Sequence, residues 1–154
     1  MSHHTTRTQS ELSDAERQSL RCVVAHMIPA SAEYGVPGAD DDTIFADIVA
    51  SLDRETDPVC QALARLDELC GRPFAAVAAD QQCSVLDRFR KDNPALAAVL
   101  IAATVRCYYR DDRIMRSLDM EPRPPFPKGF DVPQGDWSLL DPVRARGRVY
   151  RDAP

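Results

Sequence analysis

The sequence predicts an all-α protein: a compact bundle of about five to six helices around a buried central helix, followed by a long, irregular, proline-rich C-terminal arm. Apolar residues recur at helical spacing between capping residues up to about residue 120. The last 34 residues hold 7 of the 12 prolines and 3 of the 6 glycines. We therefore expect a flexible leader (1–12), a helical domain (13–120) and an extended arm (121–154) that packs on the body or on a partner.

The first helix is predicted over residues 14–27. Ser13 and Glu16 have the spacing of a capping box, in which a hydroxyl and a carboxylate bond to free backbone amides of the first turn. Pro29 ends the helix because proline has no N–H for the next hydrogen bond. The apolar residues of this segment recur at helical spacing: Leu20, Val23, Val24, Met27 and Ile28.

Two further helices follow a loop rich in glycine and proline. Asp41 or Asp42 is expected to cap the second helix, whose apolar residues share one side: Ile44, Phe45, Ile48, Val49 and Leu52. Asp57 before Pro58 indicates the start of the third, because proline at the first helical position loses no hydrogen bond. Gly71 is expected to end that helix in the left-handed conformation.

Three more helices complete the predicted bundle. Asp80 is expected to open the fourth, and Asn93–Pro94 to cap the fifth. Residues 95–105 are apolar on every side, so we expect the fifth helix to occupy the centre with the others around it. Asp111 or Asp112 can start a last, short helix.

The C-terminal arm shows no apolar periodicity, so we expect neither a regular strand nor a long helix there. It nevertheless contains the only tryptophan, two of the five phenylalanines and a tyrosine, more aromatics than a solvated disordered tail usually carries. Spaced aromatics in a proline-rich segment are typical of arms that become ordered on a surface. The surface would belong either to the chain's own helices or to a partner.

Charge and hydropathy exclude several classes of partner. A net charge of −5 argues against nucleic acid, and the arm's C-terminal arginines are nearly balanced by acidic residues of the same arm. No stretch approaches the roughly 20 apolar residues that cross a bilayer, so no direct membrane insertion is expected. The N-terminus shows neither an apolar signal core nor an Arg-Arg pair. We therefore expect a cytoplasmic location, or a periplasmic one if the chain is a trimmed mature form.

The residue types that carry catalysis or bind metals do not form a recognisable site. Five cysteines without a Cys-x-x-Cys pair are interpreted as reduced core residues. Asp40–Asp42 lacks the spacing of a calcium loop and is interpreted as helix-capping acid. Cys22 and His26 lie one helical turn apart and could form a nucleophile pair or half a metal site, but further ligands are missing. We predict no catalytic, cofactor-binding or metal-binding residue, and no catalysis by this chain alone.

Two segments resemble the gluconate 2-dehydrogenase subunit 3 family. Residues 12–49 contain a capped first helix that ends at Ile28–Pro29 and a loop, Pro37–Gly38–Ala39, that leads into an acid-capped second helix. Residues 108–152 contain a Tyr-Arg-Asp turn, a short helix, a proline-rich arm, then a tryptophan and a terminal Tyr-Arg. The middle third of the chain matches only as generic helix.

The resemblance implies a non-catalytic small subunit of an FAD-dependent sugar or alcohol dehydrogenase complex. The large subunit would be a flavoprotein of the glucose-methanol-choline type, which holds the FAD and the catalytic histidine, and some complexes add a cytochrome subunit. The small subunit would assist folding, stability or export of the flavoprotein. Because this chain lacks the twin-arginine signal of many members, the resemblance favours assembly over export here.

We expect the partner to contact the end of the helical domain and the arm. The predicted contact residues are Tyr108, Tyr109, Arg110, Pro124, Pro125, Phe126, Pro127, Phe130, Trp137, Tyr150 and Arg151. The alternative is a free-standing ligand-binding protein or enzyme whose arm covers a pocket near Tyr108, Tyr109 and His26. A third hypothesis is a self-associating scaffold.

Overall fold

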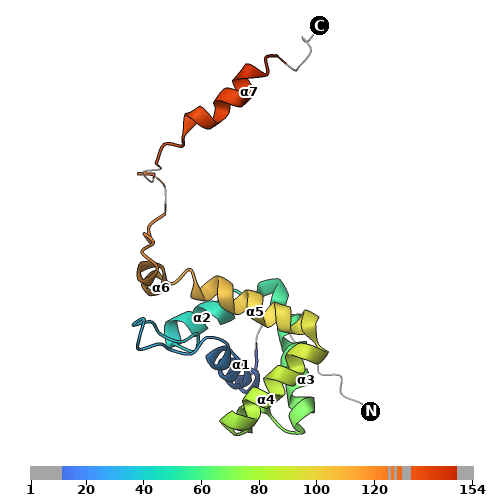
Figure 1. The fold of residues 1–154 in the computed structure, drawn as a ribbon. Helices are drawn as coiled ribbons and strands as arrows, with labels where there is room; N and C mark the ends of the chain where they lie inside the picture. Colours follow the sequence, from blue (N-terminus) through green and yellow to red (C-terminus); the bar gives the residue numbers. More distant parts are fainter. Residues whose placement is uncertain (1–11, 125, 127, 130–132, 149–154) are drawn as a thin grey trace. The chain divides into compact units, whose positions relative to one another are not determined.

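The computed structural model describes residues 12–124, 126, 128, 129 and 133–148. Over these residues the protein is all-α, as predicted: seven α-helices and three short 3-10 helices, and no β-structure beyond one bridge between Ser31 and Val36 (Figure 1). The seventh helix lies in the predicted arm. The chain divides into two compact units, which we call the helical body, ending at Pro122, and the C-terminal segment, starting at Arg123.

The first two helices of the body begin at the expected caps. In α1 (Asp14–Met27) the Ser13 amide donates to Glu16 Oε2 at 2.8 Å, and the Glu16 amide donates to Ser13 Oγ at 3.3 Å. In α2 (Asp42–Ala50) the Asp41 carboxylate accepts from the amides of Thr43 and Ile44. Both predicted starts are confirmed.

The next two helices begin earlier than predicted. The 3-10 helix η1 (Asp53–Glu55) runs directly into α3 (Thr56–Cys70), so Asp57 lies inside the first turn and the expected Asp57 cap was wrong. A second 3-10 helix, η2 (Phe74–Ala76), leads to α4 (Ala79–Asp92), which begins before Asp80. Continuous helical backbone upstream explains the first shift, because a cap is needed only where helical geometry starts.

The end of α3 and the starts of the next two helices of the body follow the sequence more closely. Gly71 terminates α3 with a φ of 66°, in the left-handed region that glycine adopts without steric cost. The fifth helix, α5 (Pro94–Tyr108), starts at its proline, and α6 (Asp112–Ser117) is capped by Asp111, whose carboxylate accepts from the Arg113 amide.

The α5 helix packs against α2, α3 and α4 but is not enclosed on every side. It buries Ala97, Leu100, Ala103, Thr104, Cys107 and Tyr108. Ile101 and Val105 remain 44% and 38% exposed, which corrects the expectation of a helix buried all round. A uniformly apolar run carries no periodicity, so the sequence could not indicate which face the neighbouring helices cover.

Leu12 belongs to the core of the body, although we expected it in the leader. Its side chain is buried, and its carbonyl accepts a hydrogen bond from Arg17 Nε at 3.3 Å. The rest of the predicted leader, residues 1–11, lies outside the described residues. The first helix is therefore anchored by a core residue just before its cap.

The C-terminal segment contains a 3-10 helix, η3 (Trp137–Leu140), followed by α7 (Asp141–Ala145). Asp136 caps η3 by accepting from the Ser138 hydroxyl at 2.6 Å and from the Ser138 amide at 3.0 Å, and these two bonds lower the pKa of its carboxyl. None of the segment's described residues is buried. The arm thus includes one short helical stretch that the sequence analysis did not predict.

None of the five cysteines forms a disulfide. Cys60 and Cys107 are buried, as expected of core residues, whereas Cys83 lies on the solvent-exposed side of α4, so its interpretation as a core residue was wrong. None of the helices described here has the length and apolar character that crossing a membrane requires.

Candidate docking surface

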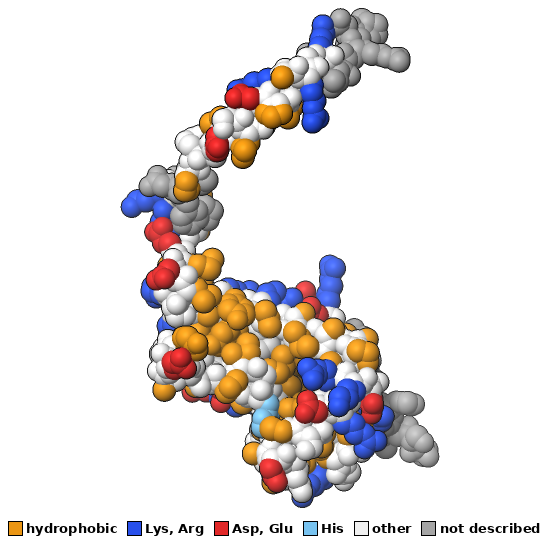
Figure 2. Space-filling view, in the orientation of Figure 1, with side chains coloured by type: hydrophobic (Ala, Val, Ile, Leu, Met, Phe, Trp, Pro, Cys, Tyr) orange, Lys and Arg blue, Asp and Glu red, His pale blue; other side chains and the backbone are white. Residues whose placement is uncertain are grey.

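One exposed side of α5 carries only apolar residues, while the charged Arg106 lies beside it. Ile101, Val105 and Tyr109 follow one another at four-residue spacing, which places them on one side of the helix. Their exposed fractions are 44%, 38% and 52%. Ala98, one turn before Ile101, and Ala102 are also exposed. We call these five residues the α5 stripe, and Figure 2 shows hydrophobic side chains gathered over this part of the body.

The stripe ends in an apolar hollow of about 240 Å³ beside Tyr109. The ring of Tyr109 stands edge-on to that of Tyr108, with centroids 5.3 Å apart and planes at 87°, a favourable aromatic arrangement. Two exposed side chains, Tyr34 and Leu118, extend the apolar rim. The residues that line the hollow are Tyr34, Val36, Tyr108, Tyr109, Ile114, Ser117 and Leu118.

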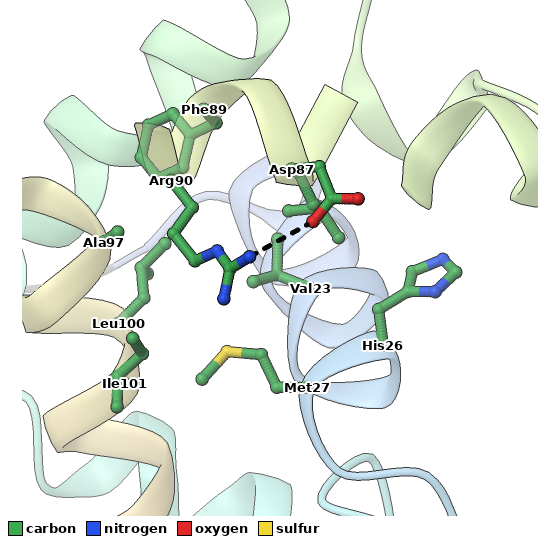
Figure 3. A pocket seen from close by; sticks show the side chains of 10 residues that line it. Val23, His26, Met27, Asp87, Phe89, Arg90, Ala97, Leu100 and Ile101 are labelled. Carbon is green, nitrogen blue, oxygen red and sulfur yellow. Dashed lines mark ion pairs between the residues drawn. The ribbon is translucent and has the colours of Figure 1, made fainter. Parts of the chain in front are cut away.

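A second hollow, of about 200 Å³, begins at Ile101 on the same stripe. Its lining comes from three helices: Val23, His26 and Met27 of α1, Leu86, Asp87, Phe89 and Arg90 of α4, and Ala97, Leu100 and Ile101 of α5. Met27 points toward Ile101 and Arg90, whereas the His26 ring points the other way (Figure 3). Asp87 and Arg90 form an ion pair at 3.6 Å. The α5 stripe therefore joins two apolar hollows into one extended surface.

Three arginines hold α5 and α6 against the α2 region. Arg106 bonds to Glu55 at 2.6 Å, and Arg110 Nε donates to Asp47 at 2.6 Å. Arg113 bridges Asp41, at 2.7 Å, and Asp111, at 3.0 Å. The helix that carries the stripe is thus tied to its neighbours by paired charges as well as by apolar packing.

These pairs keep their carboxylates ionised. Hydrogen bonds from Arg106, Arg110 and Arg113 lower the pKa values of their acidic partners, while partial burial acts in the opposite direction. The same bonds raise the pKa values of the three guanidinium groups. The acidic partners affected are Glu55, Asp47, Asp41 and Asp111. The links are therefore fully charged near neutral pH.

The two adjacent tyrosines predicted as contacts have different positions. Tyr108 is buried, and its hydroxyl donates to the Pro37 carbonyl at 3.0 Å, which fixes the Pro37–Ala39 loop on α5. Burial raises the pKa of Tyr108, so the phenol stays a neutral donor. Tyr109 is exposed, and Arg110 is bound to Asp47 and Ser51. Of these three residues, Tyr109 offers the accessible apolar side chain.

The predicted contact residues of the arm are only partly described. Pro124, Phe126 and Trp137 are exposed, Phe126 at 84%. Pro125, Pro127, Phe130, Tyr150 and Arg151 lie outside the described residues. Sequence reasoning missed further exposed apolar residues: Ile101 and Val105 of the stripe, Leu118, and Leu139, Leu140 and Val143 of the C-terminal segment. The i, i+4 spacing of Ile101 and Val105 was readable, but nothing in an all-apolar run marks it as the exposed face.

His26 makes its contacts with α4 rather than forming the suggested pair with Cys22. Its Nε2 lies 2.7 Å from Gln82 Oε1, and its Nδ1 lies 3.5 Å from Cys83 Sγ. His26 also lines a different hollow from Tyr108 and Tyr109, so the structure does not bring these three residues into one pocket. Among the described residues, no group of three His, Cys, Asp or Glu side chains is placed to hold a metal ion.

Comparison with protein-family models, curated proteins and solved structures finds no match to this chain. The fold and the surface define the class: an all-α body with an extended exposed apolar face and no assembled metal cluster in its described part. The resemblance to the subunit 3 family rests on the two sequence segments alone.

Proposed function

We propose that this chain is a non-catalytic small subunit of an FAD-dependent dehydrogenase complex of the glucose-methanol-choline type, and that it supports assembly and stability of the large flavoprotein. The sequence resemblance over residues 12–49 and 108–152 supports the class of complex. The observation that carries the binding role is the α5 stripe with a hollow at each end. The FAD would belong to the partner, and a cytochrome subunit would be a further partner in some complexes.

The chemistry of this surface suits a protein partner. Contiguous exposed apolar surface commonly marks an interaction site, and buried aromatic anchors supply much of the binding energy in interfaces. Tyr34 and Tyr109 stand exposed at one hollow, and Phe126 and Trp137 are exposed in the C-terminal segment. These rings would each gain buried area on a larger subunit.

The size of the hollows favours side chains over a substrate. Ligand pockets typically measure about 300 to 1,000 Å³, whereas the two hollows at the stripe measure about 200 and 240 Å³. Two larger hollows, of about 530 and 430 Å³, are lined by none of His26, Tyr108 and Tyr109. The alternative, a free-standing enzyme or ligand-binding protein, placed His26 with Tyr108 and Tyr109 at one pocket. Because these residues line separate hollows, the geometry favours the subunit hypothesis.

Co-expression with the glucose-methanol-choline-type flavoprotein of the same genome tests the proposal. The variant Ile101→Ser/Val105→Ser/Tyr109→Ser should bind at least about tenfold less flavoprotein, because three apolar contacts at the centre of an interface are lost. The measurements are the amount of flavoprotein that co-purifies and its flavin content. The matched control, Gln61→Ser/Glu68→Ser/Arg88→Ser, changes three exposed residues outside the stripe and should bind normally.

A truncated chain tests the C-terminal segment independently of the α5 stripe. Deletion of residues 121–154 should lower the yield and flavin loading of the large subunit if the C-terminal segment contributes to the contact. Undiminished yield, flavin content and activity with both the deletion and the stripe variant would show that the chain is not the subunit proposed. Urea unfolding of the stripe variant alone verifies that its body remains folded.

A further inference from the structure

Three side chains from α1 and α4 form a connected polar chain, of which only His26 also lines a hollow of the docking surface. Cys83 Sγ lies 3.5 Å from His26 Nδ1, and His26 Nε2 lies 2.7 Å from Gln82 Oε1. We propose that Cys83 is a nucleophilic thiol, deprotonated by His26 and oxidised to a sulfenic acid by small hydroperoxides. This proposal is independent of the subunit function.

Gln82 fixes which nitrogen of His26 carries the proton. The Gln82 side chain is buried at 6% exposure, and its Nε2 donates to the carbonyls of Phe74, at 3.1 Å, and Val77, at 3.0 Å. Both amide hydrogens are thereby used, so Oε1 is the atom that faces His26 and it can only accept. His26 Nε2 must therefore be the N–H, which leaves the Nδ1 lone pair directed at the Cys83 thiol.

The resulting order of groups is that of an activated nucleophile: a thiol, a base within reach, and a third group that orients the base. Cys83 is exposed, so a reagent in solution can reach it. The other four thiols differ: Cys60 and Cys107 are buried, Cys22 is only partly exposed, and burial raises the pKa of Cys70, which disfavours its thiolate. Cys83 is the thiol that His26 contacts.

The position of Cys83 favours a small, unanchored oxidant. Cys83 lines neither of the two apolar hollows, although its partner His26 lines the smaller one, so the thiol itself stands outside a cavity that could hold a larger substrate. A hydroperoxide needs only a thiolate and a proton source.

The oxidation moves one proton and breaks one O–O bond. The Cys83 proton moves to His26 Nδ1, the sulfur bonds to the terminal peroxide oxygen as the O–O bond breaks, and the departing oxygen takes the proton from Nδ1. The thiol and ROOH become a sulfenic acid and ROH, with the sulfur oxidised by two electrons.

The test treats the full chain with hydrogen peroxide and traps sulfenic acid with dimedone, followed by peptide mass spectrometry at each cysteine. Because a positioned base typically accelerates such a step about 100-fold or more, Cys83 should be labelled at least about tenfold faster than the partly exposed Cys70. Equal rates at Cys83 and Cys70 would overturn the proposal without the need for any variant.

The variant His26→Gln keeps a polar side chain of similar length but cannot accept the thiol proton. It should slow the labelling of Cys83 at least about tenfold and leave the rate at Cys70 unchanged. The control Ser84→Ala, at the exposed neighbour of Cys83, should label like the parent. Circular dichroism verifies the fold of His26→Gln, and parental labelling of Cys83 in that folded variant would contradict the role of His26.

Discussion

The helical body and the C-terminal segment contain similar apolar residues and use them in opposite ways. The body buries Phe74, Phe89 and a set of aliphatic residues almost completely, whereas Phe126, Trp137 and Leu139 of the segment are exposed. The difference lies in the spacing of the apolar residues along the chain. Periodic apolar residues let several helices share one core, and the proline-rich segment has no such period. Its short helix is held locally instead, by the Asp136 cap and by the bond from Trp137 Nε1 to Gln134 at 3.2 Å.

The largest difference in stability is expected when one leucine is replaced by alanine in each region. Leu66 is fully buried, so Leu66→Ala should lower the free energy of unfolding by about 2 to 5 kcal/mol, through lost burial and an unfilled cavity. Leu139 is 74% exposed, so Leu139→Ala should change the free energy of unfolding by less than about 0.5 kcal/mol. Urea unfolding followed by circular dichroism measures both, and comparable losses would break the comparison.

A glycine substitution in each region should give a smaller difference. A Cβ on Gly38 would lie 2.9 Å from the Ala30 amide nitrogen and 3.2 Å from the Ile28 carbonyl, and would also collide with the Asp40 side chain. Gly38→Ala should therefore cost about 1 to 3 kcal/mol, because backbone atoms must shift.

The matched control is Gly135→Ala in the C-terminal segment, where a Cβ would have nothing within 4 Å. It should leave the urea midpoint unchanged. If Gly38→Ala were equally neutral, the close approach of the Gly38 loop to the end of α1 would not constrain the body.

The smallest expected effect concerns the charged links within the body. Asp41, Asp47, Glu55 and Asp111 have folded-state pKa values below their ordinary values of 3.8 for aspartate and 4.5 for glutamate. The unfolded chain therefore binds these protons first as the pH falls, and the contribution to stability is complete above about pH 5 and is lost at lower pH. Urea midpoints should be level between about pH 7 and 5 and fall between about pH 4 and 3.

Arg113→Gln sharpens this prediction, because it removes the partner of both Asp41 and Asp111. It should cost about 1 kcal/mol or less near neutral pH, since the pair is partly exposed, and make the acid decline shallower. The control Arg88→Gln disrupts an exposed pair within α4 and should change the decline less. An identical acid profile in the Arg113 variant would mean that these links contribute nothing to stability.

The sequence predicted the helices better than it predicted which side of each helix is exposed. The cap at Ser13, a cap at Asp41 or Asp42, a cap at Asp111 or Asp112 and the stop at Gly71 were predicted because each acts through bonds within a few residues, and the structure places the caps at Ser13, Asp41 and Asp111. The start of the third helix was misplaced at Asp57 because η1 already supplies helical backbone ahead of it. The pairing of His26 with Cys83 joins residues 57 apart in the chain, and no local pattern contains it.

Local chemistry in the sequence therefore determined that the protein is helical, where α1, α2, α5 and α6 begin, where α1 and α3 end, and that its last part lacks a periodic apolar face. Only the tertiary structure decided which side of α5 stays exposed, that Tyr108 belongs to the core while Tyr109 does not, and which group His26 meets. The physical reason is the distance along the chain over which each kind of interaction acts. Backbone hydrogen bonds and caps act over about three to four residues, whereas burial depends on the packing of helices that are distant in the chain.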